Sequence, residues 1–388
     1  MEKSLCKARA PSPPSLSLAH THTMPRIIRK VTHADWYGEA DGALESVCAE
    51  RERKCASAHF PDLLIISIIP THPASALASQ IAAWLATARA ARAAAAAGDV
   101  SITTDAGAEA SYATSSRALA AAPHTRGLVG PHAGYAYCGH VLAHAYAGVD
   151  PARVARVVVL GPCHHVFSTA ATISGVDAAA TPFGPLTVDG ETRAGLLATG
   201  AFGSETTPLA DDEAEHSLEL HLPFLAAALG ATPTSPTSIP IVPIMVGALS
   251  PATEAAVAAA LAPLLADPAT LFVVSSDFCH WGARFGFTRT LPGLGIADGI
   301  EALDREGMAL VATQDGPGWR AYLARTGNTV CGRYPISLLL ATLAACEGVK
   351  HEVGWVAYDR SSRCVGPRDS SVSYASAVVV VKEGGAKR

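Results

Sequence analysis

Residues 156–166 read RVVVLGPCHHV. Four of the first five residues are apolar, as in a strand that is buried on both faces, and a Gly-Pro pair marks its end. His164 and His165 follow directly. Neighbouring residues on a turn diverge, so we expect one of the two imidazoles to point elsewhere. A single histidine is commonly a hydrogen-bonded loop or core residue, so the other strand ends of the chain decide its meaning.

Two further apolar runs also lead into a histidine. RGLVG at 126–130 precedes His132, and TLFVVSS at 270–276 precedes Asp277 and His280. Ligands of open α/β sheets bind outside the carboxyl ends of the strands, so we expect these side chains to share one crevice. Imidazoles beside a carboxylate suit a metal such as Fe, Zn or Cu, and they also suit acid–base chemistry near neutral pH.

The alternation of short β-branched runs with helical stretches predicts the fold class. It indicates an α/β fold with a central mixed or parallel β-sheet flanked by helices. Further strands are expected at 239–247, 353–358 and 371–382, and helices at 75–97, 217–229, 251–266, 300–314 and 335–348.

The sequence predicts a single α/β domain over 25–383. The other segments are a disordered leader at 1–24, an insertion at 42–73 and a mobile loop at 98–125 within the domain, and a tail at 384–388. The Ser- and Pro-rich residues 1–23 have organelle targeting as their alternative interpretation.

Composition excludes several classes of function. The net charge is −5 without a strong block of either sign, which gives no support for nucleic-acid or anionic-membrane binding. The apolar run at 63–70 is too short to span a bilayer. Nine dispersed cysteines without a CxxC pair indicate a reduced, cytoplasmic protein. The sequence has no Walker loop, GxGxxG or GxSxG motif, which argues against nucleotide binding and serine hydrolysis.

Three other motifs carry candidate site residues. ADDEAEHSLELHLP at 210–223 places His216 and Glu219 on one face if it is helical, and a functional and a structural role weigh equally there. Cys331 precedes a predicted helix. It is either inert packing or a metal ligand or nucleophile whose thiolate the helix start favours. Trp36 in HADWYG is either part of an aromatic wall or of the core.

Seven strings together resemble the Memo family, which is named for mediating receptor-driven cell motility. They are PHAGYAYCG, LGPCHH, DDEAEHSLELHLPF, PIMVGALS, LFVVSSDFCHWG, NTVCGRYPI and DSSVSYASA, in this order across 131–377. The resemblance extends over 25–41 and 74–383. It implies a fold like that of the class III (LigB-type) extradiol dioxygenases, which use non-haem Fe(II).

The resemblance also implies site residues. It places Fe(II) or Cu in a pocket of His132, His164 and Cys331, with redox activity, and it makes Asp277 and His280 the further, catalytic residues of that pocket.

The family is also associated with phosphotyrosine peptides, and Trp36 and Tyr137 match aromatic positions along that docking groove. This chain departs from the pattern at 42–73 and beyond His280, where Arg284 is the only basic residue that remains. Tyr334 stands where animal members have histidine.

Three functions follow as hypotheses. The first is a metal-binding redox protein of the Memo type. The second is a non-haem iron oxygenase with an unknown small substrate, in which Glu219 or Asp277 supplies a carboxylate ligand and His280 is the general base. The third is a non-enzymatic adaptor that binds a phosphopeptide, which normally needs an arginine cluster, whereas the loops offer only Arg284 and Arg333.

Overall fold

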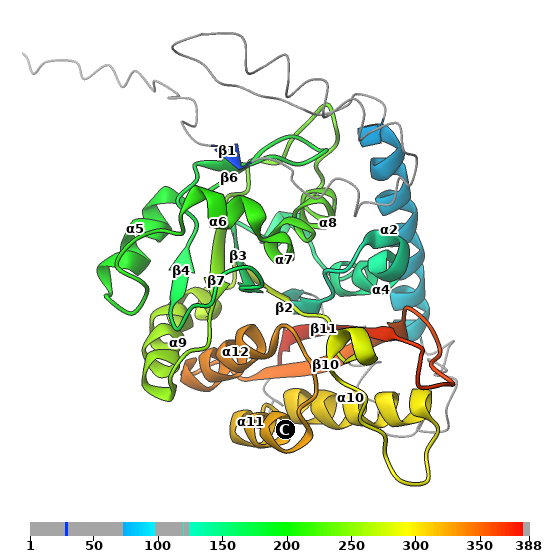
Figure 1. Cartoon of the computed structure of the whole chain (residues 1–388). Coiled ribbons are helices and arrows are strands. Elements are labelled where there is room, and N and C mark those ends of the chain that lie inside the picture. The colour runs from blue at the N-terminus through cyan, green and yellow to red at the C-terminus, as the bar shows by residue number, and fades with distance from the viewer. Residues whose placement is uncertain (1–27, 30–72, 98–118, 120–123, 383–388) are drawn as a thin grey trace, which may run out of the picture.

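A mixed sheet of eight strands forms the centre of the computed structural model, which describes residues 28–29, 73–97, 119 and 124–382. Its order is β10-β11-β2-β8-β3-β7-β4, with β9 paired to β11 (Figure 1). The strands are β2 (Thr125–Gly130), β3 (Arg156–Pro162), β4 (Ala171–Ile173), β7 (Ile241–Val246), β8 (Thr270–Ser275), β9 (His280–Trp281), β10 (His351–Arg360) and β11 (Ser371–Val381). The central β2, β8, β3 and β7 are parallel and the outer pairings antiparallel. The predicted α/β class with a mixed central sheet is confirmed.

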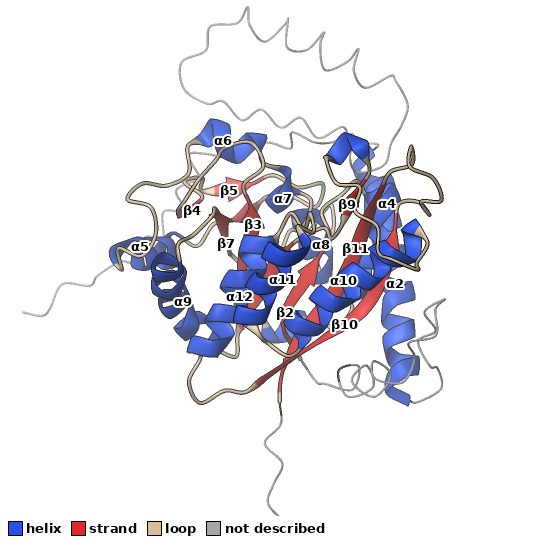
Figure 2. Ribbon diagram, turned by 60° about the horizontal axis from the view of Figure 1, so that its bottom comes forward, coloured by secondary structure: helices blue, strands red, loops and turns tan. Residues whose placement is uncertain are grey.

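Helices cover both faces of the sheet. They are α2 (Pro73–Ala97), α4 (Tyr135–Tyr146), α5 (Gly190–Ala198), α6 (Leu209–Ala214), α7 (His216–Glu219), α8 (Leu222–Ala228), α9 (Pro251–Ala266), α10 (Ile296–Ala312), α11 (Gly316–Thr326) and α12 (Arg333–Ala345). Figure 2 looks onto the face that is covered by α9 to α12. Helices α2, α4 and α8 pack on the opposite face.

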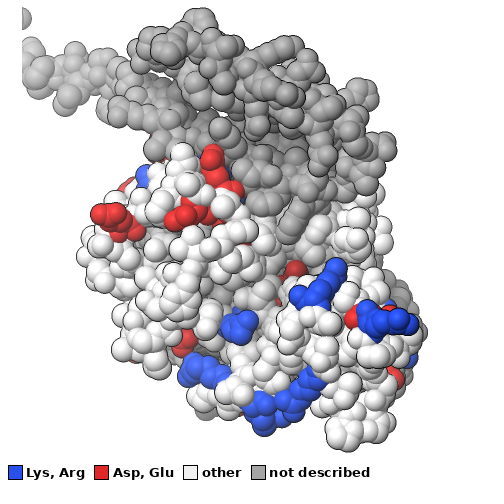
Figure 3. Space-filling model, viewed as in Figure 1, with Lys and Arg blue, Asp and Glu red and all other residues white. Residues whose placement is uncertain are grey.

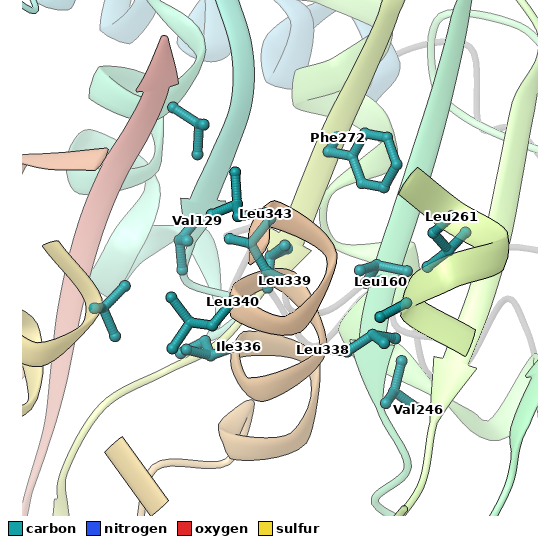
Figure 4. Close-up of a cluster of buried hydrophobic side chains, with 14 of the residues drawn as sticks. Val129, Leu160, Val246, Leu261, Phe272, Ile336, Leu338, Leu339, Leu340 and Leu343 are labelled. Carbon is teal, nitrogen blue, oxygen red and sulfur yellow. The ribbon is translucent and has the colours of Figure 1, made fainter. Parts of the chain in front are cut away.

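The alternation of side chains along β3 explains why the sheet needs both layers. Val158 and Leu160 point into the core beneath α9 and α12, and Val157 and Val159 point into the core beneath α4 and α8. All four are fully buried. Figure 4 shows the first core, where leucines of α12 surround Leu160 and its neighbours. A continuous apolar run is therefore the pattern of a central parallel strand, as predicted.

The predicted helix over 217–229 is wrong as a single element. Helix α7 ends at Glu219, and α8 begins at Leu222 with Pro223 in its first turn. Proline lacks an amide hydrogen, and its ring would clash with the carbonyl four residues earlier. The break turns the chain, so that α7 lies at the end of β3 while α8 packs under the sheet.

Helix α4 was not predicted, because Gly139 lowers its intrinsic helix propensity. This glycine is needed for packing. A Cβ atom at Gly139 would lie 2.5 Å from the Trp84 ring, which seats α2 directly on α4. Trp84 also stacks on Phe224, with ring centroids 6.1 Å apart, so one aromatic side chain joins α2, α4 and α8.

Several predicted segments lie wholly or mostly outside the described residues. These are the leader at 1–24, the insertion at 42–73, most of the loop at 98–125 and the tail at 384–388. Two residues of the predicted mobile loop are ordered parts of the fold, since Leu119 is buried against Val378 and Thr125 begins β2. Among the described helices, none is long and apolar enough to cross a membrane.

The short strand β1 (Ile28–Arg29) docks an early part of the chain through a buried ion network. It belongs to a small sheet with β5 (Ala178–Ala179) and β6 (Leu186–Thr187). The Arg29 guanidinium donates to Asp212 Oδ1 at 2.8 Å and to Glu219 Oε2 at 3.2 Å. It also donates to the main-chain oxygens of Asp212 and Glu215. One side chain thereby ties β1 to α6 and α7.

Replacing Arg29 with Ala is expected to destabilise the protein by about 3–5 kcal/mol, because two buried carboxylates lose their partner. Arg29→Lys, which keeps the charge but not the planar fork, is expected to lose less. Urea unfolding measures both. A loss of under about 1 kcal/mol for Arg29→Ala, on the same scale, would show that the network is not needed to hold β1.

The core beneath α4 contains a histidine that burial keeps neutral. His221 Nε2 donates to the Gly130 carbonyl at 3.2 Å, and Nδ1 accepts from the Tyr146 hydroxyl at 2.9 Å. Burial lowers the pKa of His221 to about 4. His221 is thus a core residue and not part of the acidic motif's surface.

This pKa predicts a loss of stability in acid. Below about pH 6.5 the unfolded chain takes up a proton on His221 that the native protein does not accept until about pH 4. The stability therefore falls as the pH falls through this window, by up to about 3 kcal/mol. His221→Gln keeps both hydrogen bonds without titrating, so its stability should fall less steeply than that of the wild type. Equal slopes in urea titrations at pH 7, 6, 5 and 4 would refute this assignment.

Candidate functional site

The carboxyl ends of β2, β8 and β3 bring the predicted residues together. These strands are neighbours in parallel register, with Gly130 opposite Ser275 and Leu160 opposite Val274. The segments that follow each strand therefore leave the sheet at the same edge. His132 and His164 come from two of these segments, and their ring centroids are 5.2 Å apart. The prediction that these strand ends meet is confirmed.

His132 is the central and most buried imidazole of this edge. Its side chain is 2% exposed, and its main-chain N–H donates to Asp277 Oδ1 at 2.9 Å. Its Nδ1 lies 2.6 Å from Ser275 Oγ, and that hydroxyl donates its own hydrogen to the Ser217 carbonyl at 2.7 Å. The network thus assigns Nδ1 as the donor and leaves a lone pair on Nε2.

That lone pair faces a thiol. His132 Nε2 lies 3.2 Å from Cys331 Sγ, which also accepts from the Asp277 main-chain N–H at 3.1 Å. Burial lowers the pKa of His132 well below its usual value, and the neighbouring imidazoles lower it further. A neutral imidazole beside a sulfur is a ligand pair that suits a soft metal.

The expected thiolate character of Cys331 is wrong for the protein without a cation. Burial raises the pKa of the thiol well above its usual range, and the Asp277 carboxylate adds to this effect. The nearby start of α12 does not offset these two causes. A bound cation would be needed to hold the sulfur as a thiolate.

His164 is oriented by a residue that the sequence did not single out, Glu215. His164 Nδ1 lies 2.8 Å from Glu215 Oε1, and its main-chain N–H donates to Oε2 at 2.6 Å. Burial alone would raise the pKa of Glu215, but the hydrogen bonds and charge of His164 outweigh it and lower the pKa to about 2. A carboxylate on Nδ1 leaves Nε2 of His164 available to a ligand.

His216 completes a group of three imidazoles. Its ring stacks on His164 with centroids 4.5 Å apart and an interplanar angle of 14°, and it lies edge-on to His132 at 5.5 Å. The ligand atoms of His132, His164 and His216 all lie within 4.8 Å of one another. His165 is exposed, with its ring 6.0 Å from His216.

A second group of ligand atoms shares His132. His132, Asp277 and Cys331 also have their ligand atoms within 4.8 Å of one another. The expected set of His132, His164 and Cys331 is therefore divided over two overlapping groups in the described part of the chain. Burial raises the pKa of Asp277, while His280 and main-chain N–H donors partly offset this effect.

His280 stands at the end of the next loop with one ring nitrogen engaged. Its Nδ1 lies 2.9 Å from the Phe278 carbonyl and 3.1 Å from the Thr329 carbonyl, so Nδ1 carries the hydrogen. The Thr329 hydroxyl is bonded to both the N–H and the C=O of His280. Its Nε2 is left as the basic atom, which suits the predicted role of general base.

The remaining candidates lie at different distances from this centre. Tyr137 is 59% exposed in the first turn of α4. Arg284 is exposed and lies 4.4 Å from the centre of the Phe285 ring, which contacts His280. Glu219 is buried against Arg29, so it does not supply a carboxylate to the histidines. Trp36 lies outside the described residues.

A buried carboxylate, Asp304, supports the loops from behind. Its Oδ1 accepts from the Cys279 N–H at 3.2 Å and from Asn328 Nδ2 at 3.0 Å, and its Oδ2 accepts from the Tyr358 hydroxyl at 2.9 Å. Burial raises the pKa of Asp304 to about 6, although these hydrogen bonds lower it. The loop with Cys279 and the loop with Cys331 are thereby fixed to one atom of α10.

Comparisons with known proteins agree with this architecture. The family model described as Memo-like protein matches residues 92–378, which include every described candidate of the metal centre. The chain is 44% identical over 259 residues to Protein MEMO1 of Xenopus laevis and 41% identical over 259 residues to that of Homo sapiens, each time covering 66% of this chain and 86% of the relative. It is 37% identical over 264 residues to Protein memo-1 homolog of Caenorhabditis elegans, covering 66% of this chain and 73% of the relative. The chain belongs to the Memo family.

Proposed function

We propose that this protein is a metal-binding redox protein that holds Fe(II) or Cu between His132, His164 and Cys331. The observation that carries the proposal is the convergence of neutral imidazole nitrogens and a thiol at the carboxyl edge of the parallel strands. Nitrogen and sulfur donors favour iron or copper over magnesium or calcium, which prefer oxygen. A bound iron or copper ion would supply one-electron redox chemistry.

The residues around the donors have separate roles in this proposal. Ser275 and Glu215 hold the hydrogens on Nδ1 of His132 and His164, so both Nε2 lone pairs remain available. The buried surroundings of Cys331 keep its sulfur a thiol until a cation arrives. Metal binding would therefore release a proton from Cys331, and the affinity should rise with pH.

Metal analysis of protein purified without chelators tests the proposal. We expect near-stoichiometric iron or copper in the wild type. Removing a ligand should weaken binding at least as much as the tenfold to hundredfold that removal of an outer-shell partner costs, so His132→Ala, His164→Ala and Cys331→Ser should each lose metal. Cys346→Ser is the matched control, because Cys346 is a buried free thiol at the far end of α12.

Two outcomes would contradict this proposal. A wild-type protein that carries no metal and cannot be loaded would refute metal binding. Metal that survives Cys331→Ser but is lost in Asp277→Asn would instead support an oxygenase with a carboxylate ligand. The group of His132, Asp277 and Cys331 is the observation that favours that second candidate, with His280 as its base.

A phosphopeptide adaptor is less well supported. Arg284 and Arg333 lie over the rings of Phe285 and Tyr334 rather than beside each other. Figure 3 shows Lys and Arg side chains in separate groups over the lower half of that face, and acidic side chains over the upper half. Capture of a phosphate normally needs converging arginines.

The cysteines support a reducing compartment, for which we propose the cytoplasm. All six cysteines in the described part of the chain are free thiols. Free thiols persist where glutathione and thioredoxin keep them reduced.

A further inference from the structure

The three stacked histidines offer a donor that the proposed ligand set leaves out. His216 belongs to the imidazole group of His132 and His164, whereas Cys331 reaches that group only through His132. We propose that His216 is a metal ligand, so that the ion is held by three imidazoles with the Cys331 sulfur on the remaining side. This inference rests on the proposed metal-binding function and adds a ligand to it.

The distances allow such a site with little movement. Nitrogen ligands lie about 2.0–2.1 Å from a transition metal, so two nitrogens of a tetrahedral site are about 3.4 Å apart. The three imidazoles already keep their ligand atoms within 4.8 Å of one another. Closing the group requires a shift of at most about 1.4 Å between any two of these atoms, which changes of side-chain torsion supply.

The backbone that carries His216 is held on both sides. Glu215 precedes it and caps α7 by accepting from the Ser217 N–H at 2.9 Å. Ser217 follows it, donates to the Pro162 carbonyl at 3.0 Å and accepts from the Ser275 hydroxyl at 2.7 Å. Both neighbours of His216 are therefore fixed to the strand ends that also carry the other two histidines.

Close packing leaves α7 no alternative position. A Cβ atom at Gly161 would lie 2.7 Å from Ser217 Oγ and 2.8 Å from the Leu218 side chain. The last residues of β3 thus touch α7 directly, and this contact sets the height of His216 above the sheet edge. A preorganised ligand of this kind binds without paying for reordering of its segment.

Glu215 serves two of the three imidazoles. Its Oε1 lies 2.8 Å from His164 Nδ1 and 3.7 Å from His216 Nδ1. A carboxylate on Nδ1 directs the opposite nitrogen to a metal, and an anion beside two imidazoles stabilises a bound cation. The alternative role of His216 is a stacking partner that only orients His164, and this alternative predicts a different result.

Co(II) loaded into the full-length protein without oxygen distinguishes the two roles. Each imidazole bound to Co(II) gives one strongly shifted exchangeable N–H signal in proton NMR. We expect three such signals in the wild type and two in His216→Ala, with affinity for Co(II) lower by about tenfold to a hundredfold or more. His165→Ala, which removes an exposed neighbour, is the control and should retain three signals and full affinity.

A second variant keeps the test decisive if His216→Ala fails to fold. His216→Gln retains polarity and much of the volume but offers no imidazole, so it should also give two shifted signals. Either variant with unchanged affinity and the wild-type number of signals would overturn the role of His216 while leaving the metal proposal intact. Absence of Co(II) binding in the wild type would overturn both.

Discussion

The parallel hydrogen bonding of β2, β8 and β3 fixes the position of every candidate ligand. Each strand is buried on both faces, and the register places their last residues side by side. A shift of any one strand would move its following loop along the sheet by about 3.3 Å for each residue. Such a shift would also exchange the side chains of the two cores, so the apolar packing of the strands protects the geometry of polar residues outside the sheet.

Hydroxyl and carboxylate groups then convert proximity into chemistry. The Ser275 hydroxyl accepts from one imidazole and donates to the backbone that carries another. Glu215 accepts from His164 and caps the short helix on which His216 lies. Both groups decide which ring nitrogen carries a hydrogen, and this choice determines which nitrogen has a lone pair for a ligand.

Strands and long helices were predictable because their patterns are local. The helix over 251–266 was predicted with its observed bounds, since Ser250 and Pro251 mark its start. The break between α7 and α8 was also local, but the apolar run around Pro223 concealed it. Helix α4 was missed because its Gly139 fits a tryptophan from a distant helix, a contact without any sequence signal.

The candidate site was predictable in part for the same reason. Histidines after apolar runs identify His132 and His164. The partner of Glu219 could not be predicted, because Arg29 lies in a two-residue strand far away in the sequence. Glu215 was one of several acids in a row, and nothing local distinguishes the one that faces His164. Its signal is the position directly before a short helix, which is common for a capping residue.

The docking of β1 has a consequence for the order in which the molecule can be completed during synthesis. Arg29 leaves the ribosome early, but its carboxylate partners are 183 and 190 residues further along the chain. Cys331 follows His132 by 199 residues. Such long separations carry a large entropic cost of closure, so these contacts form late. Until the start of α12 has emerged, the histidines lack their sulfur partner, and a nascent chain therefore presents an incomplete pocket to the metal ions of the cell.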